Sequence, residues 1–326
     1  MNKMAHESNQ TLELSVVIPI YNEEAVIPRL GNRLSEMIQA FCRRFNVLPS
    51  QVEILLVNDG SRDQSFEMLR SLCTTQPGFK LINLARNFGH QSAITAGIEI
   101  ARGQAVVVMD GDLQDPPEFV LELYQKLQEG YDVVYALREE RRGENCFKLL
   151  TASLFYKMLR KMVSMDIPLD AGDFRIMSRR VVDQVKRMQE THRFVRGMVS
   201  WVGFRQTGLK YVRDKRFAGR TKFSLIKMIR FALDGITSFT TIPLRLSSYL
   251  GVATAFIGFL YLVYIFYIKL FTDKTVTGWS STVVIILFLS GVQLISLGVI
   301  GEYIGRLYHE AKRRPLYVIE GIYEKQ

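Results

Sequence analysis

Residues 1–215 alternate between short apolar runs and longer stretches with apolar residues at helical spacing. The apolar runs predict strands at residues 14–19, 53–58, 80–84, 106–109 and 132–136. The periodic stretches predict helices at about residues 22–45, 61–74 and 90–101, the first of them capped by Asn22. Strands and helices that alternate with short links are typical of a doubly wound, mostly parallel α/β sheet.

Two long segments in the last third of the chain contain no charged residue. Residues 249–268 and 280–301 lack Lys, Arg, Asp and Glu, and each is long enough as a helix to cross a hydrocarbon core of about 30 Å. A pair of buried helices in a soluble protein is disfavoured, because helices of this length normally carry a charged face there. We therefore predict two transmembrane helices.

Basic residues flank these two segments. Arg245 precedes the first, and Arg306, Lys312 and Arg313 follow the second. Because cytoplasmic flanks are enriched in Lys and Arg, both outer ends are expected in the cytoplasm, with the protein in the inner or plasma membrane. Residues 224–241 follow a basic loop and have apolar residues at helical spacing, which predicts an interfacial amphipathic helix.

Small residues recur along the second apolar segment, at Gly298, Gly301 and Gly305. Such a stripe lets helices approach closely, which makes a homo-oligomer plausible. Glu302 lies four residues before Arg306, so the two side chains are expected to pair on the helix surface.

Composition and charge refine this division of the chain. The net charge is +10, and the basic residues gather beside the apolar segments, which favours anionic lipid over nucleic acid as a partner. The cysteines show no C-x-x-C spacing, so neither a disulfide framework nor a zinc site is expected. We expect a polar tail without a signal peptide (1–12), an α/β domain (13–215), a basic loop and interfacial helix (216–243), two membrane helices (244–306) and a cytoplasmic tail (307–326).

The strand predicted at residues 106–109 ends in two acids, Asp110 and Asp112, with Gly111 between them. Because side chains alternate along an extended chain, both carboxylates can project to one side. The glycine leaves room for a ligand to approach the backbone. Such a pair suits a hard divalent cation that also binds phosphate.

Other polar residues near this stretch have structural interpretations. Asp115 precedes Pro116, and Glu118 follows three residues after Asp115, as in a capping box, so both acids are interpreted as helix caps. His90 is interpreted as a helix-start residue and His192 as a satisfied surface or core side chain, neither as a catalytic group.

Polar residues also follow the other predicted strands. Ligands of doubly wound sheets bind outside the carboxyl ends of the strands, so residues from distant parts of the chain are expected to converge there. Tyr21, Glu23, Asp59 and Arg138 would then lie beside the acid pair, together with the loop at residues 168–175 if it folds back. The chain lacks a G-x-G-x-x-G fingerprint and a P-loop, which argues against a nicotinamide dehydrogenase and a P-loop NTPase.

Five motifs together carry a family resemblance: VIPIYNEE (17–24), VNDGSRD (57–63), LARNFG (84–89), DGDLQDPP (110–117) and GDFR (172–175). The chain resembles the polyprenyl-phosphate glycosyltransferases of the GT-A fold, an inverting family that includes dolichyl-phosphate mannose synthase and the bacterial bactoprenol glucosyltransferases. GEYIGR (301–306) and the two terminal spans resemble the bactoprenol glucosyltransferase branch. Gly111 departs from the pattern, because many relatives have alanine there.

The resemblance implies a role for each group of motif residues. It implies that the nucleotide is held by Pro19, Tyr21, Glu23 and Asp59, with Asp110 near the ribose. It implies that Mg²⁺ or Mn²⁺ is held by Asp112 and Gln114, and that the acceptor phosphate meets Arg138 and Arg175, with Asp173 at the reacting centre.

The implied reaction is the transfer of a hexose, with UDP-glucose favoured as donor, to a polyprenyl phosphate such as undecaprenyl phosphate, for modification of cell-envelope glycans. A processive polysaccharide synthase is the first alternative, but its Gln-x-x-Arg-Trp motif and additional spans are not visible. A catalytically silent membrane scaffold is the second, and the intact acids and arginines argue against it. The sequence leaves the sugar open, because sugar choice depends on contacts at the scale of about one hydroxyl group.

Overall fold

The computed structural model describes residues 12–138, 171–191, 193–212, 241–271 and 278–325. The chain divides into two compact units, one of residues 1–160, 165–222 and 315–326 and the other of residues 161–164 and 223–314. Of the predicted interfacial helix at residues 224–241, only residue 241 is described.

The first unit is built on one eight-stranded sheet in the order β7-β5-β6-β4-β1-β2-β3-β8. The strands are β1 (Leu14–Ile20), β2 (Val52–Asn58), β3 (Phe79–Leu84), β4 (Ala105–Val108), β5 (Val133–Arg138), β6 (Ala171–Ser178), β7 (Gln206–Tyr211) and β8 (Ile319–Glu324). Strands β4, β1, β2 and β3 are parallel, whereas β6 runs antiparallel to β4 and β8 antiparallel to β3. The expected mostly parallel α/β sheet is confirmed, with antiparallel strands that the sequence did not indicate.

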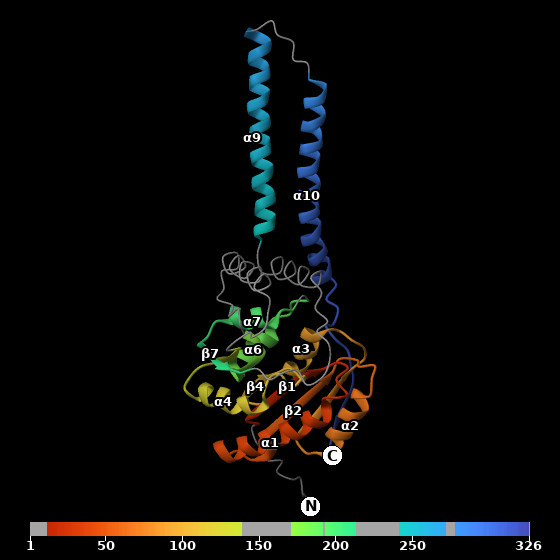
Figure 1. The fold of residues 1–326 in the computed structure, drawn as a ribbon, viewed down its shortest axis with the longest axis vertical. Helices are drawn as coiled ribbons and strands as arrows, with labels where there is room; N and C mark the ends of the chain where they lie inside the picture. The colour runs from red at the N-terminus through yellow and green to blue at the C-terminus, as the bar shows by residue number, and fades with distance from the viewer. Residues whose placement is uncertain (1–11, 139–170, 192, 213–240, 272–277, 326) are drawn as a thin grey trace, which may run out of the picture. The chain divides into compact units, whose positions relative to one another are not determined.

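Helices cover both faces of this sheet (Figure 1). One core contains residues of α1 (Ile27–Phe45), α2 (Ser65–Thr75) and α4 (Val120–Gln128), and the other contains residues of α3 (His90–Ile100), α6 (Arg179–Arg187) and α7 (Val195–Val202). Alternation along β1 supplies both cores, because Val16 and Ile18 belong to the first and Val17 to the second. Strands buried on both faces therefore read as unbroken apolar runs.

The predicted cap of the first helix is wrong. Val26 occupies the N-cap position of α1, and Asn22 lies four residues earlier. The backbone of Asn22 is left-handed, with φ of 54°. Its Oδ1 accepts a hydrogen bond from the Arg62 amide at 2.8 Å. Asn22 therefore joins the loop after β1 to the loop after β2, and α1 begins later, with a proline in its first turn.

The interpretation of Asp115 and Glu118 as caps is also wrong. The short 3₁₀ helix Pro117–Phe119 has no side-chain cap. Asp115 is buried and accepts a hydrogen bond from the Tyr211 hydroxyl of β7. Glu118 pairs with Arg33 of α1, whose Nε donates at 2.9 Å. Both acids therefore connect elements that are distant in sequence, which local spacing does not reveal.

The second unit contains α9 (Ile242–Phe271) and α10 (Trp279–Ala311). Both are long and apolar enough to cross a membrane, with candidate spans Ile242–Ile268 and Val284–Ala311. The predicted pair on α10 is confirmed, because Arg306 Nε donates to Glu302 Oε1 at 3.1 Å. A Cβ placed at Gly298 would have no atom within 4 Å, so the described residues leave the glycine stripe uncovered there.

Strand β8 comes from the predicted tail and completes one edge of the sheet. Asn83 of β3 donates to Glu320 Oε2 at 2.7 Å and accepts from Asn58 Nδ2 at 2.7 Å. The Tyr323 ring packs edge-on against Phe66, with centroids 5.8 Å apart. The end of the chain is thus part of the same folded unit as β1.

We predict that Tyr323→Ala lowers the free energy of unfolding of this unit by about 1–2 kcal/mol, because it removes a partly buried aromatic ring from the core. Ile322→Ala is the matched control, since Ile322 is 51% exposed on the same strand. Thermal unfolding of the full-length protein in detergent measures both. Equal shifts in Tm for the two variants would contradict the packing role of Tyr323.

Candidate active site

Antiparallel pairing of β4 with β6 brings two distant acids together. Val108, the last residue of β4, pairs with Arg175 of β6. Because β6 runs in the opposite direction, its beginning lies at the carboxyl end of β4, and Asp173 arrives beside Asp110. The predicted return of the Asp173 loop to this edge of the sheet is therefore observed for its described residues.

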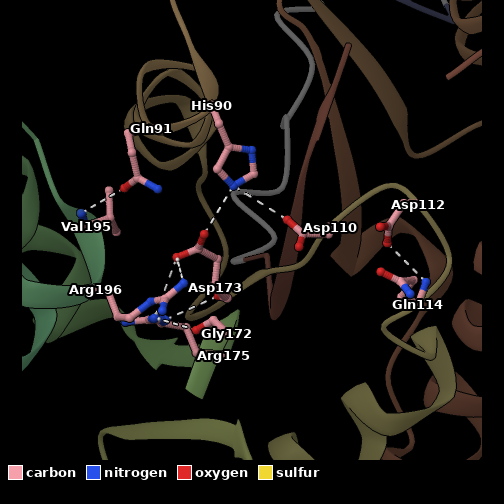
Figure 2. Close-up of polar contacts among 10 residues, drawn as sticks. All are labelled: His90, Gln91, Asp110, Asp112, Gln114, Gly172, Asp173, Arg175, Val195 and Arg196. Atoms are coloured by element: carbon pink, nitrogen blue, oxygen red, sulfur yellow. Dashed lines mark hydrogen bonds and ion pairs between the residues drawn. The ribbon is translucent and has the colours of Figure 1, made fainter. Parts of the chain in front are cut away.

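His90 connects these two acids. Its Nε2 lies 3.1 Å from Asp173 Oδ2 and 3.5 Å from Asp110 Oδ1 (Figure 2). His90 is the first residue of α3, which follows β3, so its helix-start position is confirmed. The sequence interpretation missed its contact with both acids, although the LARNFG motif that immediately precedes it marks the same strand end.

Two arginines lie on the other side of Asp173 (Figure 2). Arg196 Nη2 is 3.3 Å from Asp173 Oδ1, and Arg175 Nη2 is 3.9 Å from the same oxygen. Arg175 also donates to the Gly172 carbonyl at 2.9 Å and to the Asp173 carbonyl at 3.2 Å. Asp173 is thus surrounded by three basic side chains, of which Arg196 was not anticipated from the sequence.

These contacts oppose the effect of burial on both partners. Burial by itself would raise the pKa of Asp173, but the hydrogen bond from His90 and the charges of Arg196 and Arg175 hold that pKa well below its usual range. Burial would lower the pKa of His90, but the hydrogen bond to Asp173 and the charge of Asp110 raise it above its usual value. Asp173 is therefore ionised at neutral pH.

Asp110 lacks that compensation. Burial, together with the charges of Asp115, Asp173 and Asp112, raises the pKa of Asp110 to about 6, and His90 only partly offsets this. Carboxylates this close together repel one another unless a cation is present. The end of β4 is therefore an acidic site that a bound cation would stabilise.

The loop after Asp110 is held close to β1. Asp112 is buried, and its Oδ1 accepts a hydrogen bond from the Gln114 amide at 3.1 Å. A Cβ at Gly111 would lie 2.3 Å from Ile20 Cδ1. The space beside Gly111 is thus filled by Ile20, and the expectation that this glycine leaves room for a ligand is wrong.

Asp59, at the end of β2, orders the loop that leads into α3. Its carboxylate accepts hydrogen bonds from the Phe88 amide at 2.7 Å, the Gly89 amide at 3.0 Å and Asn87 Nδ2 at 3.0 Å. Burial raises the pKa of Asp59, although the hydrogen bonds from the Phe88 and Gly89 amides act to lower it. This side chain therefore fixes the backbone immediately before His90, in addition to any contact with a nucleotide.

The remaining predicted residues follow the same strand ends. Pro19 lies in β1, Tyr21 follows it and is 41% exposed, and the Glu23 amide donates to Ser65 Oγ at 3.0 Å. Arg138 is the last residue of β5, and its side chain lies outside the described part of the chain. The nucleotide and phosphate roles of these residues stay predictions.

Two groups of side chains at this edge of the sheet could hold a hard divalent cation, and the second fits it better. Ligand atoms of His90, Asp110 and Asp173 lie within 4.8 Å of one another, close enough to hold an ion. Asp173, however, is already paired with Arg196, whose charge would repel a metal. The oxygen donors of Asp112 and Gln114 lie apart from these basic side chains (Figure 2) and suit Mg²⁺ or Mn²⁺.

This combination of a mixed α/β sheet and acids at its strand ends agrees with comparisons between this chain and known proteins. The family described as glycosyl transferase family 2 matches residues 15–186, and the family described as the GtrB C-terminal hairpin matches residues 242–307. The chain belongs to glycosyl transferase family 2 and is a glycosyltransferase with the GT-A type of sheet.

Individual relatives match nearly the whole chain. The uncharacterized glycosyltransferase YkcC of Bacillus subtilis is 53% identical over 96% of this chain and 94% of its own. The bactoprenol glucosyl transferase of Shigella phage SfV is 42% identical over 97% of this chain and 100% of its own. Among solved structures, the mannosyltransferase PcManGT of Pyrobaculum calidifontis, in complex with GDP-Man and Mn²⁺, is 13% identical with a TM-score of 0.45 and covers 91% of this chain and 84% of its own.

The electrostatic coupling around Asp173 predicts pKa changes of opposite sign. Asp173→Asn should lower the pKa of His90, because a hydrogen-bonded negative charge is lost, whereas Arg196→Gln should raise it, because a nearby positive charge is lost. Titration of the His90 ring signals by NMR measures both, with Arg187→Gln, an exposed arginine of α6, as the control. A fall in both variants would contradict the described arrangement.

Proposed function

We propose that this glycosyltransferase transfers glucose from UDP-glucose to a polyprenyl phosphate such as undecaprenyl phosphate, with inversion at the anomeric carbon. The observation that carries the proposal is that Asp110, which follows β4, lies at one edge of the sheet with Asp173 and its arginines, and that His90 contacts both acids. The name of the phage relative, with 42% identity over the chain, supports the choice of lipid and sugar.

The donor would bind at the ends of β1, β2 and β4. In this proposal Pro19, Tyr21, Glu23 and Asp59 hold the nucleotide, and Asp110 lies near the ribose. A divalent cation, Mg²⁺ or Mn²⁺, bound by Asp112 and Gln114 would offset the negative charge that grows on the departing nucleoside diphosphate.

The acceptor supplies its own nucleophile. The second pKa of a phosphate monoester is about 6, so a phosphate oxygen is already ionised at neutral pH. That oxygen forms the bond to the anomeric carbon as the bond to the diphosphate oxygen breaks on the opposite face. Because no strong base is required, Asp173, held in its ionised form, would orient the reactants. Arg138 would position the phosphate, and the positive charge of Arg175 would act on it from within the start of β6.

A lipid acceptor requires the enzyme at a membrane surface. Helices α9 and α10 have the length and composition to anchor it there, and anchoring would lower the entropic cost of the encounter with the lipid. We place the chain in the inner or plasma membrane as a multi-pass protein, with both termini and the catalytic unit in the cytoplasm, and as a homo-oligomer that uses the glycine stripe of α10.

The direct test is a donor panel with the purified full-length protein and undecaprenyl phosphate. We expect UDP-glucose to give the highest kcat/KM among UDP-glucose, UDP-galactose, UDP-N-acetylglucosamine and GDP-mannose, with lipid-phosphate-glucose and UDP as the products. A polymeric product would indicate a processive synthase instead. Donor binding without transfer to any lipid phosphate would contradict the proposal.

Metal dependence gives a second test. Asp112→Asn should reduce turnover by about 100-fold or more, because a ligand of the charge-neutralising cation is lost. Asp183→Asn, the same substitution at an exposed position of α6, should keep parental turnover. Full activity of the parent protein in excess chelator, or parental turnover in Asp112→Asn, would show that no metal acts at this position.

A further inference from the structure

Arg196 belongs to none of the recognised motifs, yet it is the more exposed of the two arginines at Asp173. Its side chain is 23% exposed, compared with 4% for Arg175. The donors of Arg175 are directed to the carbonyls of Gly172 and Asp173. Arg175 therefore stabilises the start of β6, and Arg196 is the guanidinium that a ligand can reach.

The position of Arg196 is fixed by α3. Gln91 Oε1 accepts a hydrogen bond from the Val195 amide, the first residue of α7, at 2.9 Å (Figure 2). Gln91 follows His90, so the first turn of α3 holds both the histidine that contacts Asp173 and the helix that carries Arg196. A guanidinium held in this way loses less entropy when it binds an anion.

One donor of Arg196 has no acceptor in the part of the chain that the structure describes. Within the described residues, Arg196 Nε is buried without a hydrogen-bond partner, whereas Nη2 is directed to Asp173 Oδ1 at 3.3 Å. A buried donor without a partner has a free-energy cost, and an anion bound at the exposed part of the guanidinium would offset it. The guanidinium is thus only partly satisfied by the protein itself.

We infer that Arg196 binds the phosphate monoester of the acceptor, with Asp173 and Gln91 as its positioning residues. This inference rests on the proposed function. In the proposed function, the donor diphosphate lies beside Asp112 and Gln114. Figure 2 shows these two residues apart from Arg196, with Asp110 between them. A planar fork of donors beside Asp173 suits a phosphate on the opposite side of the sugar from the leaving group.

The test compares full-length variants in detergent with UDP-glucose and undecaprenyl phosphate. Arg196→Gln should raise the KM for the lipid about tenfold to hundredfold, the effect of losing a charged hydrogen bond, with the KM for UDP-glucose unchanged. Arg196→Lys keeps the charge without the fork and should show a smaller increase. Gln91→Leu should move the lipid KM in the same direction with Arg196 intact.

Arg187→Gln is the matched control, and UDP-glucose binding verifies that each variant is folded. An unchanged lipid KM in Arg196→Gln, or a rise in the UDP-glucose KM of equal size, would overturn the inference. A binding titration with farnesyl phosphate tests the phosphate site at Arg196 independently of the proposed glucosyl transfer. If the parent transfers no glucose, weaker farnesyl phosphate binding by Arg196→Gln still supports the phosphate site, and equal binding overturns it.

Discussion

A carboxylate with little access to solvent requires compensation for its charge. Asp173, whose side chain is 12% exposed, receives it from three basic side chains. His90, Arg196 and Arg175 come from α3, α7 and β6, so one charge fixes three elements relative to one another. The antiparallel pairing of β6 with β4 makes this possible, because it delivers Asp173 to the carboxyl end of a strand that already carries Asp110. The proximity of Asp173 to Asp110 thus depends on the antiparallel direction of β6 in the sheet.

This edge of the sheet contains two neighbouring regions of opposite charge. Around Asp110 and Asp112 negative charges accumulate, which suits a cation and a diphosphate, whereas around Asp173 positive charges accumulate, which suits a phosphate monoester. His90 lies between the two groups and contacts one acid of each. A glycosyl transfer between two phosphate-bearing substrates needs such a division, since each phosphate must be neutralised from a different side.

The sheet and the acids at its strand ends could be predicted from the sequence, because both depend on residues that are close together in the chain. Buried parallel strands are unbroken apolar runs, and the acids follow directly after them. Contacts that close over long sequence separations were missed: Asp115 with Tyr211, His90 with Asp173, Arg196 with Asp173, and β8 with β3. Asn22 was mistaken for a cap because asparagine before a helix is typical of one. Its side chain instead accepts a hydrogen bond from a neighbouring loop, which local sequence does not reveal.

Our central claim is that Asp173 is a permanently charged anchor that orients the reactants and does not accept a proton from the acceptor. The most direct measurement is turnover as a function of pH for the parent and Asp173→Asn at saturating UDP-glucose and undecaprenyl phosphate. We predict measurable turnover in Asp173→Asn, with both profiles rising near pH 6 as the acceptor phosphate ionises. Complete loss of turnover at every pH in a folded variant that still binds UDP-glucose would contradict the claim.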